Sequence, residues 1–334
     1  MKKRSSAMKI LVTGASGFLG SHIAERLASE GHQVRVLVRE SSSHEFLQGF
    51  PHEEAIGDIA EAESLPAAVD GIEGVAHAAG LVKAWDEAHF ASVNGQGTAN
   101  LLAAIERNAP HFKRFVYVSS LSAHGSSPDG KPRPVDAEPK PVSAYGRSKL
   151  LGEVAVRESS LAAKSVILRM PVIYGPRDPA LTTMFQAVRF RLAPLLMGGH
   201  NRVSVVYADD AARAVISTLT AEADVAGKVY TPEDGNVYTW RDLLEAIEKA
   251  MGHGTVVLPV PRVGYDLAAL LAEVGAKVIR RPVIFNRDKV REMAQRSWVC
   301  SAETLRRDVG WRAEVDITEG ARRTGEWYQS HGWV

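Results

Sequence analysis

A glycine-rich turn near the start of the chain, residues 14–20 (GASGFLG), constrains the fold more than any other segment. It follows an apolar run at residues 10–13, which is too short and too β-branched for a helix and indicates a buried parallel strand. Beyond the turn, Ile23 and Leu27 fall on one helical face, and Gly31 is placed to end that helix. A strand, a glycine turn and a helix N-terminus together offer free backbone N–H groups, so this segment predicts a pyrophosphate-binding turn.

The first half of the chain continues as alternating strands and helices. A helix is expected at residues 98–107, and further strands are expected at 34–38, 54–58, 75–80, 115–120 and 166–169. This rhythm predicts the α/β class, with a Rossmann-type doubly wound parallel sheet that binds ligands at the carboxyl ends of its strands. Gly20, Gly80 and Ser120 all follow such ends, so we expect them to line one crevice.

The second half of the chain has a different pattern. Prolines interrupt it, and a strand-like run at residues 203–207 alternates with helical patterns at 240–250 and 321–328. We therefore expect a cofactor-binding Rossmann domain at residues 8–175, with strands added from later segments. A smaller, mixed α/β substrate lobe is expected at residues 176–334.

Charge and hydropathy exclude several classes of function. The 334 residues carry a net charge of +1, which gives no basic patch for nucleic acid. No run approaches the roughly 18 apolar residues of a transmembrane span, so no stable membrane insertion is expected. The apolar stretch at residues 264–278 is expected to pack in the core or a lid, with an interfacial helix on a membrane surface as the alternative. The basic leader at residues 1–7 lacks a signal-peptide core, and the lone Cys300 suits a reducing compartment, so we expect a cytoplasmic protein.

Tyr145 and Lys149 are the strongest candidates for chemistry. On a helix their side chains lie on the same face, about 5–6 Å apart at Cβ. The ammonium group is expected to lower the pKa of Tyr145 toward the working range, and Ser120 is available to hydrogen-bond the substrate oxygen whose proton moves. A tyrosine–lysine pair of this spacing is also common on solvated helix faces. The catalytic interpretation therefore depends on the glycine turn in the same chain.

Several motifs occur in a characteristic order along the chain. They are the glycine turn, HAAG at 77–80, VNGQGT at 93–98, VSS at 118–120, YGRSK at 145–149 and RMPVIYGP at 169–176. In this order they resemble the extended short-chain dehydrogenases/reductases (the NAD-dependent epimerase/dehydratase family) over nearly the whole chain. Within that family the sequence is most similar to the dihydroflavonol reductase and 3β-hydroxysteroid dehydrogenase branch, and nucleotide-sugar epimerases form the neighbouring branch.

The resemblance implies a nicotinamide dinucleotide bound along the carboxyl edge of the sheet. The cofactor-binding residues that it implies are Gly14, Ser16, Gly17, Phe18, Leu19, Gly20, Arg39, Asp58, Ile59, Ala78, Ala79, Gly80, Ser119, Tyr145, Lys149, Pro171 and Val172. In this scheme the glycines hold the pyrophosphate, Asp58 hydrogen-bonds the adenine amino group, and the turn at Pro171 contacts the nicotinamide. No metal site is expected.

The resemblance also implies the catalytic residues, which are Ser120, Tyr145, Lys149 and Asn94. Tyr145 would be the proton donor, and Lys149 would tune it and hold the nicotinamide ribose. Ser120 would bind the substrate carbonyl, with Ser119 and Ser122 as near alternatives. Asn94 would brace the active-site end of its helix, and an N-cap is its other interpretation.

The choice of cofactor depends on the end of the second strand. NAD enzymes commonly place an acidic residue there, whereas this strand ends in Val38-Arg39. An arginine fork suits a 2′-phosphate, and the serines at 41–43 add hydroxyl donors. We therefore predict NADP(H) in preference to NAD, and a solvated strand-end arginine is the alternative.

Two positions argue against a sugar nucleotide as the substrate. Where epimerases carry an asparagine in the turn after the sixth strand, this chain has Val172. Their arginine for the diphosphate aligns with Val203, one residue from Arg202, and such a slip on a strand reverses the side chain's face. The pocket is therefore expected to be apolar, with candidate lining residues that equally suit packing: Lys83, Trp85, Tyr174 and Met184.

The sequence therefore predicts an NADP(H)-dependent oxidoreductase. Its small-molecule substrate would be a ketone or secondary alcohol on a dihydroflavonol-, steroid- or keto-lipid-like frame. A nucleotide-sugar epimerase or dehydratase is the enzymatic alternative, and a redox sensor that binds NADP without turnover is the non-enzymatic one. A homodimer through the Tyr145 helix is somewhat favoured, since Leu150, Leu151 and Val154 suit such a contact, although core packing explains them too.

Overall fold

The computed structural model describes residues 7–279, 282–283 and 285–334. Its centre is a seven-stranded sheet in the order β11-β6-β5-β4-β1-β2-β3, in which every neighbouring pair is parallel. The strands are β1 Lys9–Thr13, β2 Gln33–Val38, β3 Glu53–Ile56, β4 Gly74–His77, β5 Arg114–Ser120, β6 Ser165–Met170 and β11 Val229–Tyr230. This sheet confirms the predicted α/β class and doubly wound architecture.

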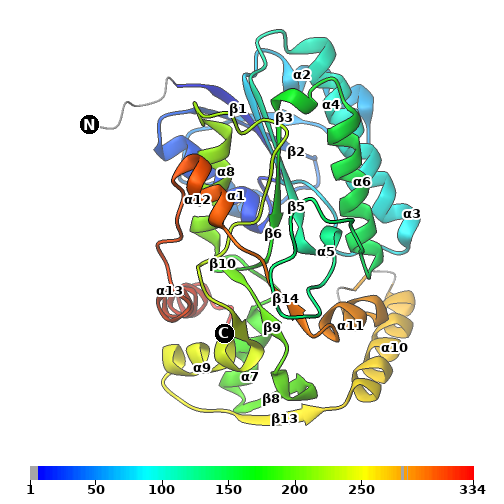
Figure 1. Cartoon of the computed structure of the whole chain (residues 1–334), viewed down its shortest axis with the longest axis vertical. Helices are drawn as coiled ribbons and strands as arrows, with labels where there is room; N and C mark the ends of the chain where they lie inside the picture. Colours follow the sequence, from blue (N-terminus) through cyan, green and yellow to red (C-terminus); the bar gives the residue numbers. More distant parts are fainter. Residues whose placement is uncertain (1–6, 280–281, 284) are drawn as a thin grey trace.

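Helices cover both faces of the sheet (Figure 1). Because side chains alternate along a strand, Ile10 and Val12 of β1 face one hydrophobic cluster and Leu11 faces the other. The first cluster is completed by α1 Phe18–Ser29, α8 Ala208–Leu219 and α12 Glu303–Val309. The second is completed by α2 Pro66–Val69, α4 Gly97–Asn108 and α6 Ala144–Glu158. Burial on both faces explains why these strands are continuous apolar runs.

The strand order reverses beside β1, which lies between β4 and β2. In open α/β sheets the crevice at such a point, outside the carboxyl ends of the strands, is where ligands bind. The loops after β1, β2, β4 and β5 therefore converge there. Short elements in and around these loops are η1 Glu45–Leu47, η2 Ala62–Ser64, α3 Glu87–Phe90, the π-helix η3 Ala91–Gln96, α5 Leu121–His124 and η4 Ala162–Lys164.

A smaller lobe is built from three short sheets and five helices of the described chain. The sheets pair β7 Val172–Tyr174 with β10 Val205–Tyr207, β8 Leu192–Leu196 with β13 Val256–Val260, and β9 Arg202–Val203 with β12 Tyr238–Thr239 and β14 Ser297–Trp298. The helical elements are α7 Thr182–Arg189, η5 Met197–Gly199, α9 Trp240–Met251, α10 Arg262–Ile279, α11 Arg287–Met293 and α13 Ile317–Ser330. The strand expected at 203–207 is thus two strands, β9 and β10, interrupted at Ser204.

The domain division at residue 175 remains a proposal. A separate hydrophobic cluster, with Phe185, Leu243 and Tyr328 at its centre, supports a lobe of its own. The chain nevertheless returns to the large sheet at β11, and α8 and α12 pack on that sheet.

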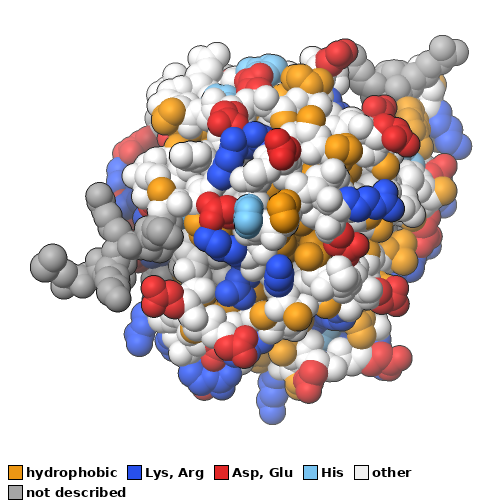
Figure 2. Space-filling view, turned by 90° about the horizontal axis from the view of Figure 1, so that it is seen from above, with side chains coloured by type: hydrophobic (Ala, Val, Ile, Leu, Met, Phe, Trp, Pro, Cys, Tyr) orange, Lys and Arg blue, Asp and Glu red, His pale blue; other side chains and the backbone are white. Residues whose placement is uncertain are grey.

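Residues 264–278 are expected to pack in the core or a lid, and the prediction of core packing is wrong for their leucines. They form most of α10, and Leu267, Leu270, Leu271 and Val274 are exposed. The helix lies at the edge of the lobe in Figure 1. Seen from the opposite end of the molecule (Figure 2), charged side chains of both signs are interspersed with scattered hydrophobic ones.

Candidate active site

The glycine turn brings the ends of β1 and β4 into contact. Gly14 has φ of 71°, a left-handed conformation that glycine adopts without strain. A Cβ placed on Gly14 would lie 2.7 Å from the Ala79 nitrogen, and one on Gly20 would overlap the Gly14 carbonyl oxygen. The Gly17 N–H donates to that oxygen at 3.0 Å, which closes the turn. Glycines therefore permit the close approach of backbone on which a dinucleotide crevice depends.

The turn leads directly into the N-terminus of α1. Gly17 is the N-cap and provides no side-chain acceptor, and Ser16 precedes it as a half-buried turn residue. The first-turn N–H groups of Phe18, Leu19 and Gly20 have no partner within a helix. Together with the positive end of the helix dipole they form an anion site, which fits the pyrophosphate of a dinucleotide.

Small residues follow β4 where the cofactor would lie. The Ala79 N–H donates to the hydroxyl of Thr13 at 3.1 Å. A Cβ on Gly80 would lie 3.0 Å from Oδ1 of Asn94 and 3.6 Å from Nζ of Lys149. Gly80 therefore lies against two of the proposed catalytic residues. Ala78 and Ala79, which precede it, have only methyl side chains, and this fits the proposed role of leaving room for a ribose.

Arg39 and Asp58, the two proposed adenosine-binding residues, lie at the ends of β2 and β3. The Arg39 guanidinium is 3.6 Å from the Asp58 carboxylate, and the arginine side chain is exposed. The hydroxyl of Ser42 accepts the Arg39 N–H at 3.0 Å. The neighbouring Ile59 is buried against Gly97 of α4, so it forms part of the floor below this end of the crevice.

Asn94 lies in the π-helix η3, and insertions of this kind are common at functional sites. Its side chain accepts the Leu81 N–H at 2.7 Å and donates to the Leu81 carbonyl and to the hydroxyl of Ser148. Those bonds tie the loop after Gly80 to α6. The contacts fit the bracing role implied by the family resemblance, and the N-cap interpretation is wrong because Asn94 lies inside the π-helix.

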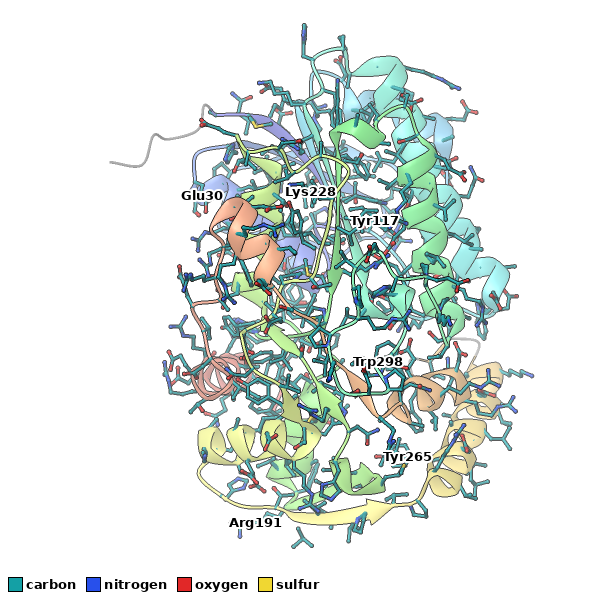
Figure 3. The ribbon with its side chains drawn as sticks, in the orientation of Figure 1. Glu30, Tyr117, Arg191, Lys228, Tyr265 and Trp298 are labelled. Carbon is teal, nitrogen blue, oxygen red and sulfur yellow. The ribbon has the colours of Figure 1, made fainter. Side chains whose placement is uncertain are left out.

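Helix α6 carries Tyr145 and Lys149 on one face. Ser143 caps it by accepting the Gly146 N–H at 3.0 Å. The ammonium group of Lys149 is buried; it donates to the Val118 carbonyl at 2.6 Å and lies 4.5 Å from the ring centre of Tyr117, which is labelled in Figure 3. The hydroxyl of Ser120 lies close enough to the Tyr145 phenol to affect its pKa. The phenol, the ammonium group and the aliphatic hydroxyl therefore converge at the end of β5.

The expected lowering of the pKa of Tyr145 is wrong in this structure. The pKa of Tyr145 is raised to about 12, chiefly by burial and also by the negative charge of Glu292, and the neighbouring Ser120 hydroxyl offsets part of this rise. Burial also lowers the pKa of Lys149 to about 8, against the opposing charge of Glu153. A phenol with this pKa is protonated at neutral pH.

Ser119 and Ser122, the alternatives to Ser120, differ in their surroundings. Ser119 is buried and donates to Glu153 at 2.7 Å, so the expectation that its hydroxyl binds the carbonyl is wrong. Any contact of Ser119 with the cofactor would come from its backbone. Ser122 lies near the Glu292 carboxylate, and its N–H donates to the Ser120 hydroxyl at 3.1 Å. Ser120 remains the best placed of the three.

The remaining candidates are spread over the start of β7, the lobe and the loop after Gly80. Pro171 is half-buried between β6 and β7, and the half-buried Val172 is the first residue of β7. Tyr174 and Met184 belong to the lobe's hydrophobic cluster, so they pack rather than line the site. Lys83 and Trp85 are exposed on the loop after Gly80.

Sequence reasoning missed the carboxylates of α11. Glu292 is buried and accepts from the Ser143 hydroxyl at 2.5 Å, and Asp288 accepts the Ala144 N–H at 2.6 Å. Trp298, labelled in Figure 3, donates its indole N–H to the Glu292 carbonyl and fixes that end of α11. Glu292 is 149 residues from Ser143 in sequence, and no local pattern indicates the contact. Only the Ser143 cap had a recognisable signal, a serine at the start of a helical pattern.

A buried ion pair beneath Ser119 was also missed. Arg169 of β6 donates to both oxygens of Glu153, at 2.9 and 2.8 Å, and both side chains are buried. The acceptor is on α6, four residues after Lys149. This bidentate pair fixes the catalytic helix to the sheet.

Comparisons with known proteins agree with this geometry. The model of the "NAD dependent epimerase/dehydratase family" matches residues 10–231. A "Ceramide reductase" of Caulobacter vibrioides is 31% identical over 97% of this chain and 96% of the relative. A "2-alkyl-3-oxoalkanoate reductase" of Stenotrophomonas maltophilia is 30% identical over 95% of this chain and 98% of the relative. The crystal structure of UDP-glucose 4-epimerase from Thermus thermophilus in complex with NAD superposes with a TM-score of 0.76, at 25% identity, over 96% and 99% of the two chains.

A doubly wound sheet with a glycine turn and a tyrosine–lysine pair defines an NAD(P)-dependent oxidoreductase of the extended short-chain dehydrogenase/reductase type. The chain belongs to the NAD-dependent epimerase/dehydratase family, as its motif order predicted. Within the described residues, no cluster of His, Cys, Asp and Glu is suited to hold a metal ion. None of the described helices has the length and apolarity that crossing a bilayer requires.

Proposed function

We propose that this chain is an NADP(H)-dependent reductase of a ketone carried on a largely apolar substrate. The observation that carries the proposal is that the Tyr145 phenol and the Ser120 hydroxyl lie close together at the end of β5, where the buried ammonium of Lys149 donates to the Val118 carbonyl. Two hydroxyl groups at one point can both hydrogen-bond a carbonyl oxygen, as acid catalysis of ketone reduction requires.

The bound nicotinamide supplies the hydride that reduces the carbonyl carbon. Tyr145 donates its hydroxyl proton to the oxygen of the ketone, and its high pKa keeps that proton in place until the oxygen becomes basic. Ser120 hydrogen-bonds the same oxygen and orients it. Lys149 supplies positive charge near Gly80, where it favours the developing phenolate and can hydrogen-bond the nicotinamide ribose.

Three observations support the substrate class and the preference for NADP. Val203 is buried in the lobe's hydrophobic cluster and carries no charge, and the guanidinium of the exposed Arg202 donates to the Gly130 carbonyl, which supports an apolar pocket over a site for a sugar diphosphate. Arg39 and Ser42 offer donors for a 2′-phosphate. The relatives from Caulobacter and Stenotrophomonas are named for reduction of ceramide and of 2-alkyl-3-oxoalkanoate, both of which carry long apolar groups.

A nucleotide-sugar epimerase is the second candidate. The likeness to UDP-glucose 4-epimerase over almost the whole of both chains favours it. The hydrophobic surroundings of Val203 count against it.

The test is to follow NADPH oxidation with keto lipids, steroid ketones and aromatic ketones, beside UDP-sugars as the competing class. We expect turnover of an apolar ketone and a loss of about 10²–10⁴ in kcat for Tyr145→Phe, with NADPH binding retained. Turnover of UDP-sugars alone would overturn the substrate class. Full activity of Tyr145→Phe would overturn the mechanism.

A further inference from the structure

Helix α10 turns its apolar side away from the protein. Its exposed stripe consists of Val263, Leu267, Leu270, Leu271, Val274 and Val278, spaced at three and four residues. Val263 and Val278, at the two ends, are 78% and 79% exposed, so the stripe is open along its whole length. An ordinary surface helix buries such a stripe against the core.

The opposite side of α10 fixes this orientation. The Tyr265 hydroxyl donates to the Pro194 carbonyl at 2.8 Å, and the ring of Tyr265 contacts that of Phe285 edge to face. Glu273 accepts from the side chain and the backbone of Arg287, both at 2.9 Å. Tyr265, Ala269, Glu273 and Ala276 share one helical face, so the apolar stripe points the other way.

The two-stranded sheet next to α10 adds a second apolar surface. In the register of β8 and β13, Leu192 pairs with Val256 and Pro194 with Leu258. All four side chains are exposed, while the alternate residues face the lobe's hydrophobic cluster. Pro194 also accepts the Tyr265 hydrogen bond, which joins this sheet to α10. Figure 1 shows both elements along the lower edge of the molecule.

The stretch of chain around β8 is positively charged. Residues 179–208 contain three arginines, at positions 189, 191 and 202, and no carboxylate. The two carboxylates of α10, Asp266 and Glu273, are paired with Arg262 and Arg287. Within the described residues no carboxylate pairs with Arg191, which Figure 3 labels at this edge, or with Lys277. Basic residues beside an exposed apolar surface complement anionic lipid headgroups.

Two strained residues bracket β8. Arg191 has φ of 58° and Met197 has φ of 49°, and both side chains are exposed. Left-handed backbone at residues other than glycine costs free energy and is concentrated at functional sites. Here it presents a cation and a thioether at the edge of the exposed sheet face.

We propose that the lobe-tip surface is a docking surface for an anionic lipid bilayer. This surface is defined as the exposed stripe of α10 together with Leu192, Pro194, Val256 and Leu258. The stripe and the sheet face would enter the boundary between headgroups and acyl chains, while Arg191 and Lys277 contact the headgroups. α10 adjoins α11, whose Asp288 and Glu292 contact the start of the catalytic helix. Uptake of a lipid ketone from that bilayer is a consequence that rests on the proposed function.

The test is flotation of the full chain with vesicles. We expect binding to phosphatidylcholine vesicles that contain about one-third phosphatidylglycerol, and weaker binding to phosphatidylcholine alone. Raising the salt from about 0.1 M to about 1 M should weaken the binding to anionic vesicles, because the charges are screened. Leu267→Glu/Leu271→Glu should reduce the bound fraction at least tenfold, and Arg191→Glu/Lys277→Glu should reduce it to the level of neutral vesicles.

Ile56→Glu is the matched control, because Ile56 is 55% exposed on β3, close to the 57% of Leu267, and lies outside the lobe. It should bind vesicles as the unchanged chain does. A chain that stays in solution with anionic vesicles would overturn the proposal. A leucine double variant that still binds vesicles fully would also overturn the proposal. The proposal would likewise be overturned if that variant converted a dimer to a monomer, because the occupant of the surface would then be a second copy of the chain.

The two proposals fail separately. Vesicle binding needs no turnover, so it tests the docking surface even if no ketone is reduced. Conversely, the leucine double variant should reduce a water-soluble ketone at the same rate as the unchanged chain, whatever its binding to vesicles.

Discussion

Arg39 illustrates how much of the cofactor site depends on a single side chain. It stands at the end of β2, where Ser42 accepts its N–H and Asp58 lies 3.6 Å from its guanidinium. With 60% of the side chain exposed, this ion pair is worth little to stability, so the arginine is free to contact a ligand. A 2′-phosphate would offer it a stronger, bidentate acceptor.

Replacing Arg39 with alanine should therefore weaken NADP binding and leave NAD binding unchanged. A hydrogen bond to a charged group is worth about 1.5–3 kcal/mol, so the Kd for NADP should rise about 10- to 100-fold. Isothermal titration with both cofactors measures this, and Arg39→Lys is the control that keeps the charge. Equal affinities of the unchanged chain for NAD and NADP would contradict the assignment.

Asp178 is a buried carboxyl group outside the site with a predictable effect on stability. Burial raises the pKa of Asp178 to about 6, although the N–H groups of Ala180 and Leu181 donate to it. Because the folded pKa exceeds the unfolded value of about 3.9, the native state binds the proton more tightly. This contribution to stability is complete below about pH 4 and is lost as the pH rises through about 6.

Relative to Asp178→Asn, the unchanged chain should lose about 2 kcal/mol of unfolding free energy between pH 4 and pH 6. Urea denaturation of both proteins across that range gives the difference directly. A difference that stays constant with pH would show that Asp178 ionises normally in the fold.

At the scale of elements, the active site depends on the contact between α11 and the start of α6. Asp288 and Glu292 are one turn apart on α11. Glu292 accepts from Ser143, the N-cap of α6, and Asp288 accepts the N–H of Ala144, its first residue. Negative charge at a helix N-terminus is favourable. The negative charge of Glu292 also raises the pKa of Tyr145. The position of α11, an element of the lobe, therefore affects the pKa of the proton donor.

Glu292→Gln should lower the pKa of Tyr145, because the negative charge disappears while the side chain keeps its shape. The basic limb of the pH–rate profile should move to lower pH, and unfolding should become easier by about 1.5–3 kcal/mol through the lost charge-assisted bonds. Asp288→Asn is the control, since that residue caps α6 but is not among the groups that shift the Tyr145 pKa. An unmoved basic limb would mean that Glu292 acts on the fold alone.

At the scale of the whole molecule, a second exposed surface lies on the far side of the sheet from α1. A groove between α4 and α6 is lined by small residues such as Gly95 and Ala99 and by two exposed apolar ones, Leu151 and Val154. Small residues let a facing helix approach closely, and a symmetric pair of such faces closes into a dimer. We propose that this groove forms the dimer contact.

Leu151→Glu should therefore produce a monomer, which light scattering after gel filtration would detect. Leu267→Glu/Leu271→Glu should leave the dimer intact, because that surface is separate. A chain that is already a monomer at working concentration would contradict the dimer.

Much of the fold could be predicted from local sequence, because the burial of short strands and the backbone conformation of turns depend on a few neighbouring residues. Residues 10–13 had to be a strand since only a sheet buries β-branched residues on both faces, and Gly14 was required by its positive φ. The strands at 115–120 and 166–169 were found within one residue of their ends for the same reason. Residue spacing and chemistry indicated Tyr145, Lys149 and Ser120, the family resemblance gave them roles, and the three side chains do converge.

Tertiary structure decided the features that depend on which surfaces meet. Composition alone could not tell that the leucines of α10 face outward, because Tyr265 and Glu273 on the other side hold the helix. Ser119 and Ser120 are adjacent in sequence, yet only packing turned the first toward Glu153 and left the second beside Tyr145. The high pKa of that tyrosine likewise arises from burial and from a carboxylate far along the chain. Local propensity depends on a few neighbouring residues. The solvent exposure of a side chain and the electric field at it depend instead on residues that are distant in sequence and close in the folded structure.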